Sequence, residues 1–423
     1  MSDQHRFTPT ILREYDVRGI VGTTLDITDA RALGRAFGTM VRRRGGTRIS
    51  VGYDGRLSSP AMETALIEGL VSTGIDVDRI GLGPTPMLYF SVFANDADAG
   101  VMVTGSHNPP DYNGFKMMIG KDAMFGEKIQ ELGRMAAAGD FERGNGVVRD
   151  RPAFAAYMDR LMVDLADPGL GHQVPRVVWD PGNGAAGDVV QELVKRLSTD
   201  HPNGHQVING RIDGTFPAHH PDPTVEENLV QLQEAVRAGG YDMGVAFDGD
   251  GDRIGAVDGD GRVVWGDQLL AILAADVLAD HPGATIIADV KASKVLFDRI
   301  AEMGGTPLMW KTGHSLIKTK MIETGAPLAG EMSGHIFFKH RYYGFDDAIY
   351  AAIRLLLTVS REGGGLKALR DRLPSVINTP ELRFDCAEDR KFAVVPEVRD
   401  RLAQNGADVD ATDGVRVTTE DGW

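Results

Sequence analysis

The strongest constraint on the fold is one arrangement of residues that occurs three times in the chain. In each case an apolar run typical of a strand ends in an aspartate, and a tight turn and a helix follow. The three runs are 48–54, 176–180 and 284–289. More than a hundred residues separate each run from the next, which is too far for a solenoid repeat. The spacing predicts a domain-sized α/β unit that is used three times.

Each predicted unit contains a later strand that leads directly into a loop of polar and reactive residues. These strands are expected at 100–104, 243–247 and 327–330. The loops that follow read Thr-Gly-Ser-His-Asn-Pro, Asp-Gly-Asp-Gly-Asp-Arg and Gly-Glu-Met-Ser-Gly-His. Because ligands of α/β sheets bind outside the carboxyl ends of the strands, we expect the three loops to converge on one cleft.

The first loop offers a candidate nucleophile. Ser106 follows a predicted strand and has His107 beside it, and a serine next to a base is a common catalytic arrangement. Pro109 and Pro110 lack backbone donors, so no regular helix can run through this loop. Taken alone, the same residues also describe a polar turn between a strand and a helix.

The second loop predicts a metal site. Asp248, Asp250 and Asp252 place three carboxylates in five residues, and such like charges repel strongly unless a cation joins them. Oxygen ligands favour a hard ion, Mg²⁺ before Ca²⁺. An EF-hand is excluded, because Arg253 stands at the sixth loop position and Gly259 at the twelfth. An acidic surface turn is the alternative.

The third loop offers a carboxylate, a hydroxyl and an imidazole in Glu331, Ser333 and His335. Such groups can form hydrogen bonds with neighbouring hydroxyls of a sugar. Three basic residues follow other predicted strand ends of the same unit, namely Lys291, Lys311 and His314. They could supply positive charge for a phosphate, although each by itself also suits an ordinary surface position.

Near the N-terminus, Arg13 and Arg18 lie in a polar segment that ends at Gly19. One interpretation is a solvated loop. The other is a pair of arginines presented to an anion, with the glycine allowing close approach of the backbone.

Other classes of site are not supported by their motifs. Residues 182–187 match G-x-G-x-x-G, but the next predicted strand ends in Asn209 rather than in the acid that binds a ribose. Thr104 breaks the G-x-S-x-G pattern around Ser106. The chain has no G-x-x-x-x-G-K-[ST] loop, and no His or Cys group has zinc spacing.

Composition and charge narrow the class of protein. The formal net charge of −15 argues against nucleic acid or an anionic membrane as a partner. The single cysteine, Cys386, excludes disulfides within the chain and favours a cytoplasmic location. The first residues lack the pattern of a secretion signal, and the apolar run 269–279 reads as a buried helix rather than a membrane span.

We expect four segments along the chain, divided at Gly-rich or turn-forming stretches. They are 1–152 with the serine loop, 153–257 with the metal loop, 258–373 with the sugar-binding loop, and 374–423. The last segment is too short for an independent core and predicts an incomplete domain. In it we expect a strand at 381–385, a helix at 395–404 and a turn at 420–422.

Four motifs together resemble the α-D-phosphohexomutase family, and within it the bacterial phosphomannomutase/phosphoglucomutase group. They are Glu-Tyr-Asp-Val-Arg-Gly at 14–19, Thr-Gly-Ser-His-Asn-Pro at 104–109 with Gly-Phe-Lys at 114–116, Asp-Gly-Asp-Gly-Asp-Arg at 248–253, and Gly-Glu-Met-Ser-Gly-His at 330–335. The resemblance covers residues from about 9 to 423. With Met332 at its third position, the last motif resembles the one in enzymes that use mannose and glucose phosphates.

The resemblance implies a fold and an activity. The fold would be three similar α/β domains with mixed sheets sandwiched by helices, plus a partial C-terminal α+β domain, around a central cleft. The activity would be interconversion of hexose 1-phosphate and hexose 6-phosphate, with hexose 1,6-bisphosphate as intermediate and activator. Sugar phosphates would be the only partners of a monomer or weak dimer.

The resemblance also implies roles for residues. Ser106 would carry a phosphate, and Mg²⁺ would be held by Asp248, Asp250, Asp252 and a phosphoserine oxygen. The catalytic group would further include Arg18, Lys116 and Arg253 as cations, Lys116 also as general base, and His107 and His335 in proton handling or support. Substrate would be bound by Tyr15, Lys291, His314, Glu331 and Ser333.

One family feature has no counterpart in these 423 residues, namely the Arg-Ala-Ser-Asn-Thr-type loop that binds the distal phosphate. We therefore expect a truncated chain or a weakened grip on substrate, with a raised KM. The alternatives are an impaired mutase or a protein that binds Mg²⁺ and sugar phosphate without turnover. A phosphatase or phosphotransferase that uses the same phosphoserine is a further alternative.

Overall fold

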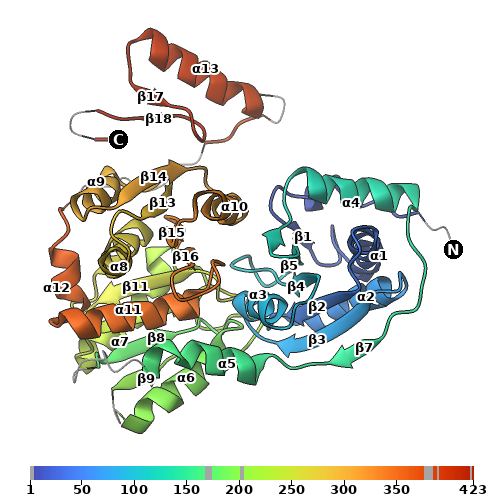
Figure 1. Ribbon diagram of the computed structural model, residues 1–423, viewed down its shortest axis with the longest axis horizontal. Helices are drawn as coiled ribbons and strands as arrows, with labels where there is room; N and C mark the ends of the chain where they lie inside the picture. Colours follow the sequence, from blue (N-terminus) through green and yellow to red (C-terminus); the bar gives the residue numbers. More distant parts are fainter. Residues whose placement is uncertain (1–3, 167–173, 201–203, 376–383, 388–389, 420–421) are drawn as a thin grey trace.

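The computed structural model describes residues 4–166, 174–200, 204–375, 384–387, 390–419 and 422–423. Three mixed sheets with covering helices form the main body, and a small segment with a two-stranded sheet follows (Figure 1). In the described part of the chain, no helix is both long and apolar enough to cross a membrane.

The first unit contains a seven-stranded sheet and four α-helices. Its strands are β1 (Val17–Ile20), β2 (Arg48–Tyr53), β3 (Asp76–Leu82), β4 (Ala99–Val103), β5 (Tyr112–Ile119), β6 (Asp122–Ala123) and β7 (Val148–Asp150). Its helices are α1 (Ile27–Arg43), α2 (Ser59–Val71), α3 (Thr85–Ala94) and α4 (Glu127–Ala138), after a short 3-10 turn, η1 (Pro9–Ile11). Helix α1 begins at a capping box, in which Asp26 and Asp29 each accept a backbone N–H of the other.

The second unit has a five-stranded sheet. Its strands are β8 (Val177–Asp180), β9 (His205–Val207), β10 (Met243–Phe247), β11 (Ile254–Asp258) and β12 (Val263–Val264). Its helices are α5 (Phe154–Met162), α6 (Gly187–Asp200) and α7 (Val230–Gly239), with 3-10 turns η2 (Asp164–Ala166) and η3 (Glu226–Leu229). Strands β11 and β12 pair in antiparallel fashion and form a hairpin around the turn at 258–261.

The third unit has a four-stranded sheet. Its strands are β13 (Thr285–Asp289), β14 (Thr306–Trp310), β15 (Leu328–Gly330) and β16 (Ile336–Phe338). Its helices are α8 (Gly266–Asp280), α9 (Lys294–Glu302), α10 (His314–Thr324), α11 (Ala348–Glu362) and α12 (Gly365–Asp371). Helix α8 contains the apolar run 269–279, and most of its side chains are buried as expected.

The three sheets repeat one strand order. It is β5-β4-β2-β3 in the first, β11-β10-β8-β9 in the second and β16-β15-β13-β14 in the third. In each sheet, the strand that leads to the repeated aspartate lies between two strands parallel to it. The strand that follows the reactive loop runs antiparallel to the strand that precedes the loop. The predicted fold class, an α/β unit used three times, is therefore confirmed.

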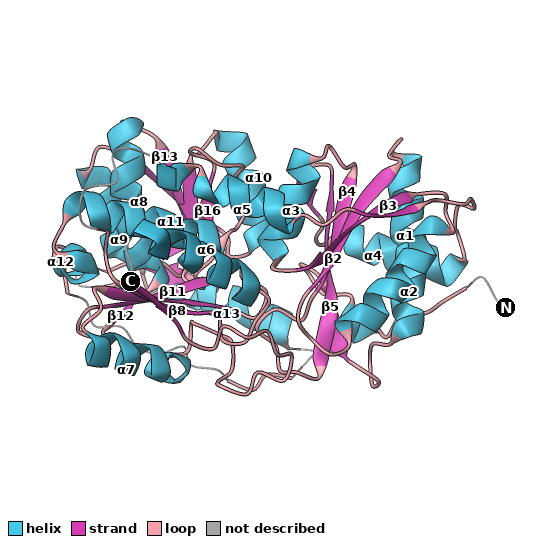
Figure 2. Cartoon of the chain, turned by 90° about the horizontal axis from the view of Figure 1, so that it is seen from below, coloured by secondary structure: helices cyan, strands magenta, loops and turns pink. Residues whose placement is uncertain are grey.

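The hydrophobic core joins the units. In the first unit α1 and α2 lie on one side of the sheet and α3 on the other (Figure 2). The side chains of α3, such as Leu88, belong to one buried cluster with Leu193 of α6 and Leu356 of α11. Because this cluster crosses from unit to unit, the strand ends that carry the reactive loops are held in fixed positions relative to one another.

The C-terminal segment lies beside the third unit (Figure 1). It contains α13 (Lys391–Gln404), β17 (Val409–Asp410) and β18 (Arg416–Val417). The expected helix is present and begins earlier than predicted, at Lys391. The expected strand falls largely on 381–383 and the expected turn on 420–421, which lie outside the described residues. The three boundaries between the four predicted segments stay a prediction.

Candidate active site

Strand ends from three units bring their loops into contact. Ser106 follows β4, residues 248–252 follow β10, and His335 follows β15. The Ser106 hydroxyl donates to Asp248 Oδ2 at 2.9 Å. Arg253 Nε donates to His335 Nε2 at 3.1 Å, and these two residues also form a backbone bridge. The expected convergence of the three loops is present.

The backbone of the serine loop is tightly held. Ser106 has φ of +48°, an uncommon value for a residue with a side chain, and its N–H donates to Thr104 Oγ1 at 2.8 Å. Arg56 is buried and donates to the carbonyl oxygens of Ser106 and Asn108 at 2.7 and 2.6 Å. These bonds fix the backbone of the loop, and the Ser106 hydroxyl points toward Asp248.

The three aspartates of the second loop are buried and close together. Their candidate ligand oxygens lie within 4.8 Å of one another. One oxygen each of Asp250 and Asp252 has no hydrogen-bond partner among the described residues. Burial, with the charges of Asp250 and Asp252, raises the pKa of Asp248 well above its usual value. Buried carboxylates with free oxygens and mutual repulsion fit a hard divalent cation.

Gly249 allows the serine and metal loops to approach each other. A Cβ at this position would lie 2.3 Å from the carbonyl oxygen of Ser106, far inside the normal contact distance. Only glycine therefore fits between Asp248 and Asp250 in this arrangement.

Lys116 of β5 lies against the same carboxylates. Its Nζ is 2.8 Å from Asp250 Oδ2 and also contacts Asp252. Burial alone would lower the pKa of Lys116, but the carboxylates outweigh it and raise this pKa above its usual value. The carboxylates that raise this pKa are the candidate metal ligands themselves. Lys116 serves as a cation in this arrangement, and the general-base role implied by the resemblance stays a prediction.

Positive charge surrounds Ser106. The three cations expected there come from β1, β5 and the metal loop, and they are Arg18, Lys116 and Arg253. His107 Nδ1 lies 3.3 Å from Ser106 Oγ. Burial, together with these cations, lowers the pKa of His107 to about 2. This ring is neutral at physiological pH and fits hydrogen bonding rather than the carrying of charge.

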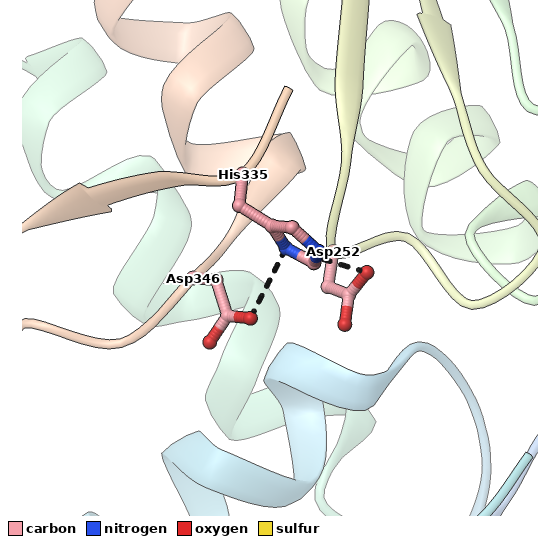
Figure 3. A group of neighbouring side chains, drawn as sticks. All are labelled: Asp252, His335 and Asp346. Carbon is pink, nitrogen blue, oxygen red and sulfur yellow. Dashed lines mark ion pairs between the residues drawn. The ribbon is translucent and has the colours of Figure 1, made fainter. Parts of the chain in front are cut away.

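His335 lies between two carboxylates (Figure 3). Its Nδ1 is 3.2 Å from Asp346 Oδ2 and 3.7 Å from Asp252 Oδ1. Its Nε2 accepts a hydrogen bond from Arg253, so the proton of the neutral ring belongs on Nδ1, facing Asp346. The lone pair on Nε2 therefore points toward Arg253.

Asp346 connects several groups and was not found by sequence reasoning. It is buried, its Oδ1 accepts from Lys318 Nζ at 2.8 Å, and its Oδ2 lies 3.6 Å from His314 Nδ1. Burial would raise the pKa of Asp346, but Lys318 and the two histidines hold it well below its usual value. In sequence, its only signal was an acidic pair before a helix, which is equally typical of an N-cap.

The cleft next to Ser106 contains two cavities. One of about 370 Å³ is lined by Arg13, Glu14, Tyr15, Asp16, Arg18, Ser106, His107, Asn108, Lys116, Arg253, His314 and His335. The other, of about 760 Å³, is lined by Tyr15, Val290, Lys291, Thr312, Asp413, Val415, Arg416, Val417 and Trp423. Tyr15 belongs to both, and burial raises the pKa of its hydroxyl to about 12. The predicted substrate-binding residues Tyr15, Lys291 and His314 thus face the cleft.

Two of the predicted substrate-binding residues lie outside these linings. Glu331 is buried, its carboxylate accepts from the N–H of Gly313 at 2.6 Å, and burial raises its pKa. Ser333 is half-buried in the same loop. Both belong to the loop that also carries His335, next to the cleft.

Family models match most of the chain. Models described as phosphoglucomutase/phosphomannomutase, alpha/beta/alpha domains I, II and III, match residues 9–143, 156–261 and 265–376 respectively. They follow in the same order as the three sheets.

Relatives of known name resemble the chain over nearly its full length. A phosphomannomutase/phosphoglucomutase of Pseudomonas aeruginosa is 45% identical over 98% of this chain and 88% of its own. A phosphoglucomutase of Neisseria gonorrhoeae is 42% identical over 98% of this chain and 89% of its own. Among solved structures, a phosphoglucomutase/phosphomannomutase family protein of Burkholderia thailandensis has a TM-score of 0.90 at 42% identity, covering 98% of this chain and 89% of that one.

Proposed function

This chain belongs to the phosphoglucomutase/phosphomannomutase family, and on that premise we propose that its cleft interconverts hexose 1-phosphates and hexose 6-phosphates of mannose or glucose. The observation that carries the proposal is the Ser106 hydroxyl, held against Asp248 inside a cleft lined by cations. That arrangement suits a serine that carries a phosphoryl group, because the charge of the group is balanced from several sides.

In the proposed reaction, the phosphoryl group begins on Ser106 Oγ. A hydroxyl oxygen of the sugar monophosphate forms a new P–O bond as the bond from phosphorus to Ser106 Oγ breaks. The product is a hexose 1,6-bisphosphate, and the serine is left as a hydroxyl. After the bisphosphate turns over in the cleft, its other phosphoryl group returns to Ser106 and the isomeric monophosphate leaves.

The proton of the attacking sugar hydroxyl needs an acceptor near the cleft. We assign it to His335 Nε2, whose single lone pair becomes available when Arg253 turns from it toward the phosphoryl group, and Lys116 stays the alternative acceptor that the resemblance implies. Asp346 Oδ2 lies 3.2 Å from His335 Nδ1 and would support the imidazolium that forms when Nε2 takes up the hydroxyl proton. In the reverse transfer, the same atom returns the proton.

The three aspartates are the proposed ligands of Mg²⁺, with a phosphoserine oxygen as a further ligand. When bound, this ion would stabilise negative charge on the transferring phosphoryl group. Arg18, Lys116 and Arg253 add fixed positive charge around Ser106. His107 accompanies the serine as a neutral hydrogen-bonding partner.

Substrate binding is assigned to the remaining predicted residues. Tyr15, Lys291 and His314 line the cavities of the cleft and would hold the sugar phosphate. Glu331 and Ser333 would bind sugar hydroxyls from the loop after β15.

Several finer points belong to the same proposal. We propose Mg²⁺ as the ion, hexose 1,6-bisphosphate as activator, a monomer or weak dimer as the working form, and the cytoplasm as its location. The single exposed cysteine, Cys386, is compatible with a reducing compartment. The predicted segments 1–152, 153–257, 258–373 and 374–423 stand as proposed domains.

The test is the Ser106→Ala variant, with Ser72→Ala as a control outside the cleft. We expect Ser106→Ala to lower conversion of mannose 1-phosphate to mannose 6-phosphate by at least about a thousand-fold, because the phosphoryl carrier is removed. Intact-mass measurement should find one phosphate on the wild type and none on the variant. Conversion that survives in Ser106→Ala would contradict the proposal.

The same assay separates the alternative reactions. A phosphatase that uses this serine would release inorganic phosphate and show no dependence on added bisphosphate. A binding protein without turnover would gain thermal stability from sugar phosphate and produce neither product. A mutase should produce the isomer with little inorganic phosphate.

A further inference from the structure

A third cavity lies between the first and third units, apart from the cleft. Its volume is about 370 Å³, which falls within the range of pockets for small organic ligands. One wall comes from α3 and the turn between β5 and β6, and the other from α10 and the loop 339–345. None of its lining residues lines either cavity of the cleft.

Aromatic rings form much of the lining. Phe93 and Phe345 lie with ring centres 5.4 Å apart, and the rings of Tyr343 and Phe345 are stacked at 5.7 Å. Phe93 and Tyr343 are half-buried, so part of each ring faces the cavity rather than the protein interior. Such an arrangement offers a flat, apolar slot for another ring.

Positive charge gathers at the same cavity. Lys121, Lys318 and Lys339 are among its lining residues, against one acidic residue, Asp122. Lys121 and Lys339 are exposed, and neither forms an ion pair with a carboxylate in the described part of the chain. Lys121 Nζ lies 5.1 Å from the centre of the Phe93 ring. Unpaired ammonium groups beside aromatic rings suit a ligand with a ring and a negative charge.

We propose that this cavity binds an aromatic monoanion. The flat ring of the ligand lies against Phe93 and Tyr343, and its carboxylate, sulfonate or phosphate faces Lys121 and Lys339. No residue that lines this cavity belongs to the catalytic group proposed for the cleft.

One ion pair separates this cavity from the cleft. Lys318 lines the cavity, with Nζ 4.5 Å from the centre of the Tyr89 ring, and donates to Asp346 at 2.8 Å. The other oxygen of Asp346 faces His335, which lines the cleft. A bound anion that attracts Lys318 weakens its bond to Asp346 and thereby alters how His335 is held. Binding at the cavity is therefore coupled to turnover in the cleft.

The binding test uses anilinonaphthalene sulfonate, an aromatic monoanion whose fluorescence rises in apolar surroundings. Titration of the full chain should give saturable binding of one molecule per chain. The double variant Lys121→Ala with Lys339→Ala should bind it roughly ten-fold more weakly, because two charge contacts are lost. The matched control, Lys195→Ala with Lys294→Ala, changes net charge equally at exposed lysines elsewhere and should bind as the wild type does.

Three results would overturn the proposal. One is equal affinity of the two double variants for the probe. Another is displacement of the probe by a hexose 6-phosphate, which would place it in the basic cleft. The third is a dimer that the probe dissociates, since the cavity would then belong to a contact between copies of the chain. A further variant, Tyr343→Ala, removes part of the slot without changing charge and should also weaken binding.

The coupling has its own readout. Saturating probe should change the kcat for hexose phosphate conversion at least two-fold in the wild type and leave that of Lys318→Met unchanged. An unchanged kcat in the wild type would overturn the link through Lys318. Absence of conversion before any probe is added would instead count against the function proposed for the cleft, so the two failures are distinguishable.

Discussion

Several buried charged side chains at the cleft have a partner in another unit. Lys116 of the first unit contacts Asp250 of the second, and Arg253 of the second contacts His335 of the third. Breaking a buried pair by removing one partner is costly, because the remaining charge stays in a place of low polarity. Single substitutions in this network therefore test function and the fit between units together.

Asp346 offers a clear test at this scale. Asp346→Asn should lower kcat about 10- to 100-fold with little change in KM, because His335 loses the carboxylate that orients its ring and supports its positive form. Steady-state kinetics measures both constants. The exposed Asp298→Asn is the matched control and should behave as the wild type. A rise in KM alone, at constant kcat, would show that Asp346 acts on substrate binding instead.

The metal site gives a second test. Mg²⁺ should raise the midpoint of thermal unfolding in a saturable way, since an ion that binds only the folded state stabilises it by mass action, by about 2.7 kcal/mol at a hundred times Kd. Asp248→Asn should abolish this gain. It should cost little without metal, because burial and its two neighbours already raise the pKa of Asp248 and disfavour its charge. Equal gains in variant and wild type would place the ion elsewhere.

At the scale of elements, the start of α11 carries a buried acid with an unusual environment. Asp347 is the N-cap, its side chain accepts from the N–H of Tyr350, and it also accepts the hydroxyls of Tyr157 and Tyr342. Burial outweighs these bonds and raises the pKa of Asp347 to about 6. The helix is thus tied to α5 of the second unit through a group that titrates below neutral pH.

The raised pKa of Asp347 predicts a pH dependence of stability. A pKa that is raised in the folded state gives stability that is fully present below about pH 4 and lost as pH rises through about 6. Because a tenfold change in proton affinity corresponds to about 1.4 kcal/mol, the loss from Asp347 is about 3 kcal/mol. Asp347→Asn cannot ionise, so its free energy of unfolding relative to the wild type should improve by about that amount between pH 4 and pH 7. Urea unfolding at several pH values measures this, and a difference independent of pH would contradict it.

At the scale of the whole molecule, the three units form one body and the C-terminal segment is attached to it by few contacts. Asp413 accepts the N–H of Thr312 at 2.9 Å, and Arg416 donates to the carbonyl oxygens of Val290 and Ala292. By contrast, a single buried cluster runs from α3 through α6 to α11. The body and the segment should therefore respond differently to substitution.

Arg416→Ala tests this difference. Loss of its two carbonyl contacts should speed proteolytic cleavage within 384–423 several-fold and leave the thermal midpoint of the body within about 2 °C. Limited proteolysis with mass spectrometry locates the cleavage, and calorimetry gives the midpoint. Arg399→Ala, an exposed arginine on α13, is the control. A drop in the midpoint of the body would show that the segment is part of its cooperative unit.

The chemistry of the strand ends was readable from the sequence because it is local. An apolar run followed by Gly, Pro or Asp predicts where a strand ends, and residues such as Ser106 and the three aspartates are adjacent to those ends. The repeated pattern also predicted that equivalent loops meet, and the strand order confirms the repeated unit. Motif spacing was enough to predict the strand ends, the residues beside them and the repeated unit, and no contact between distant residues had to be known.

Tertiary structure alone decided how these local pieces act on one another. Arg56 and Asp346 look like ordinary surface charges in the sequence, yet both are buried against loops that they hold in place. The protonated state of Lys116 depends on carboxylates more than 130 residues away. Sequence spacing determines which residues follow a strand, whereas burial and the approach of charges from different units determine which of them carries a proton, because desolvation and Coulomb energies depend on distances that only the packed fold sets.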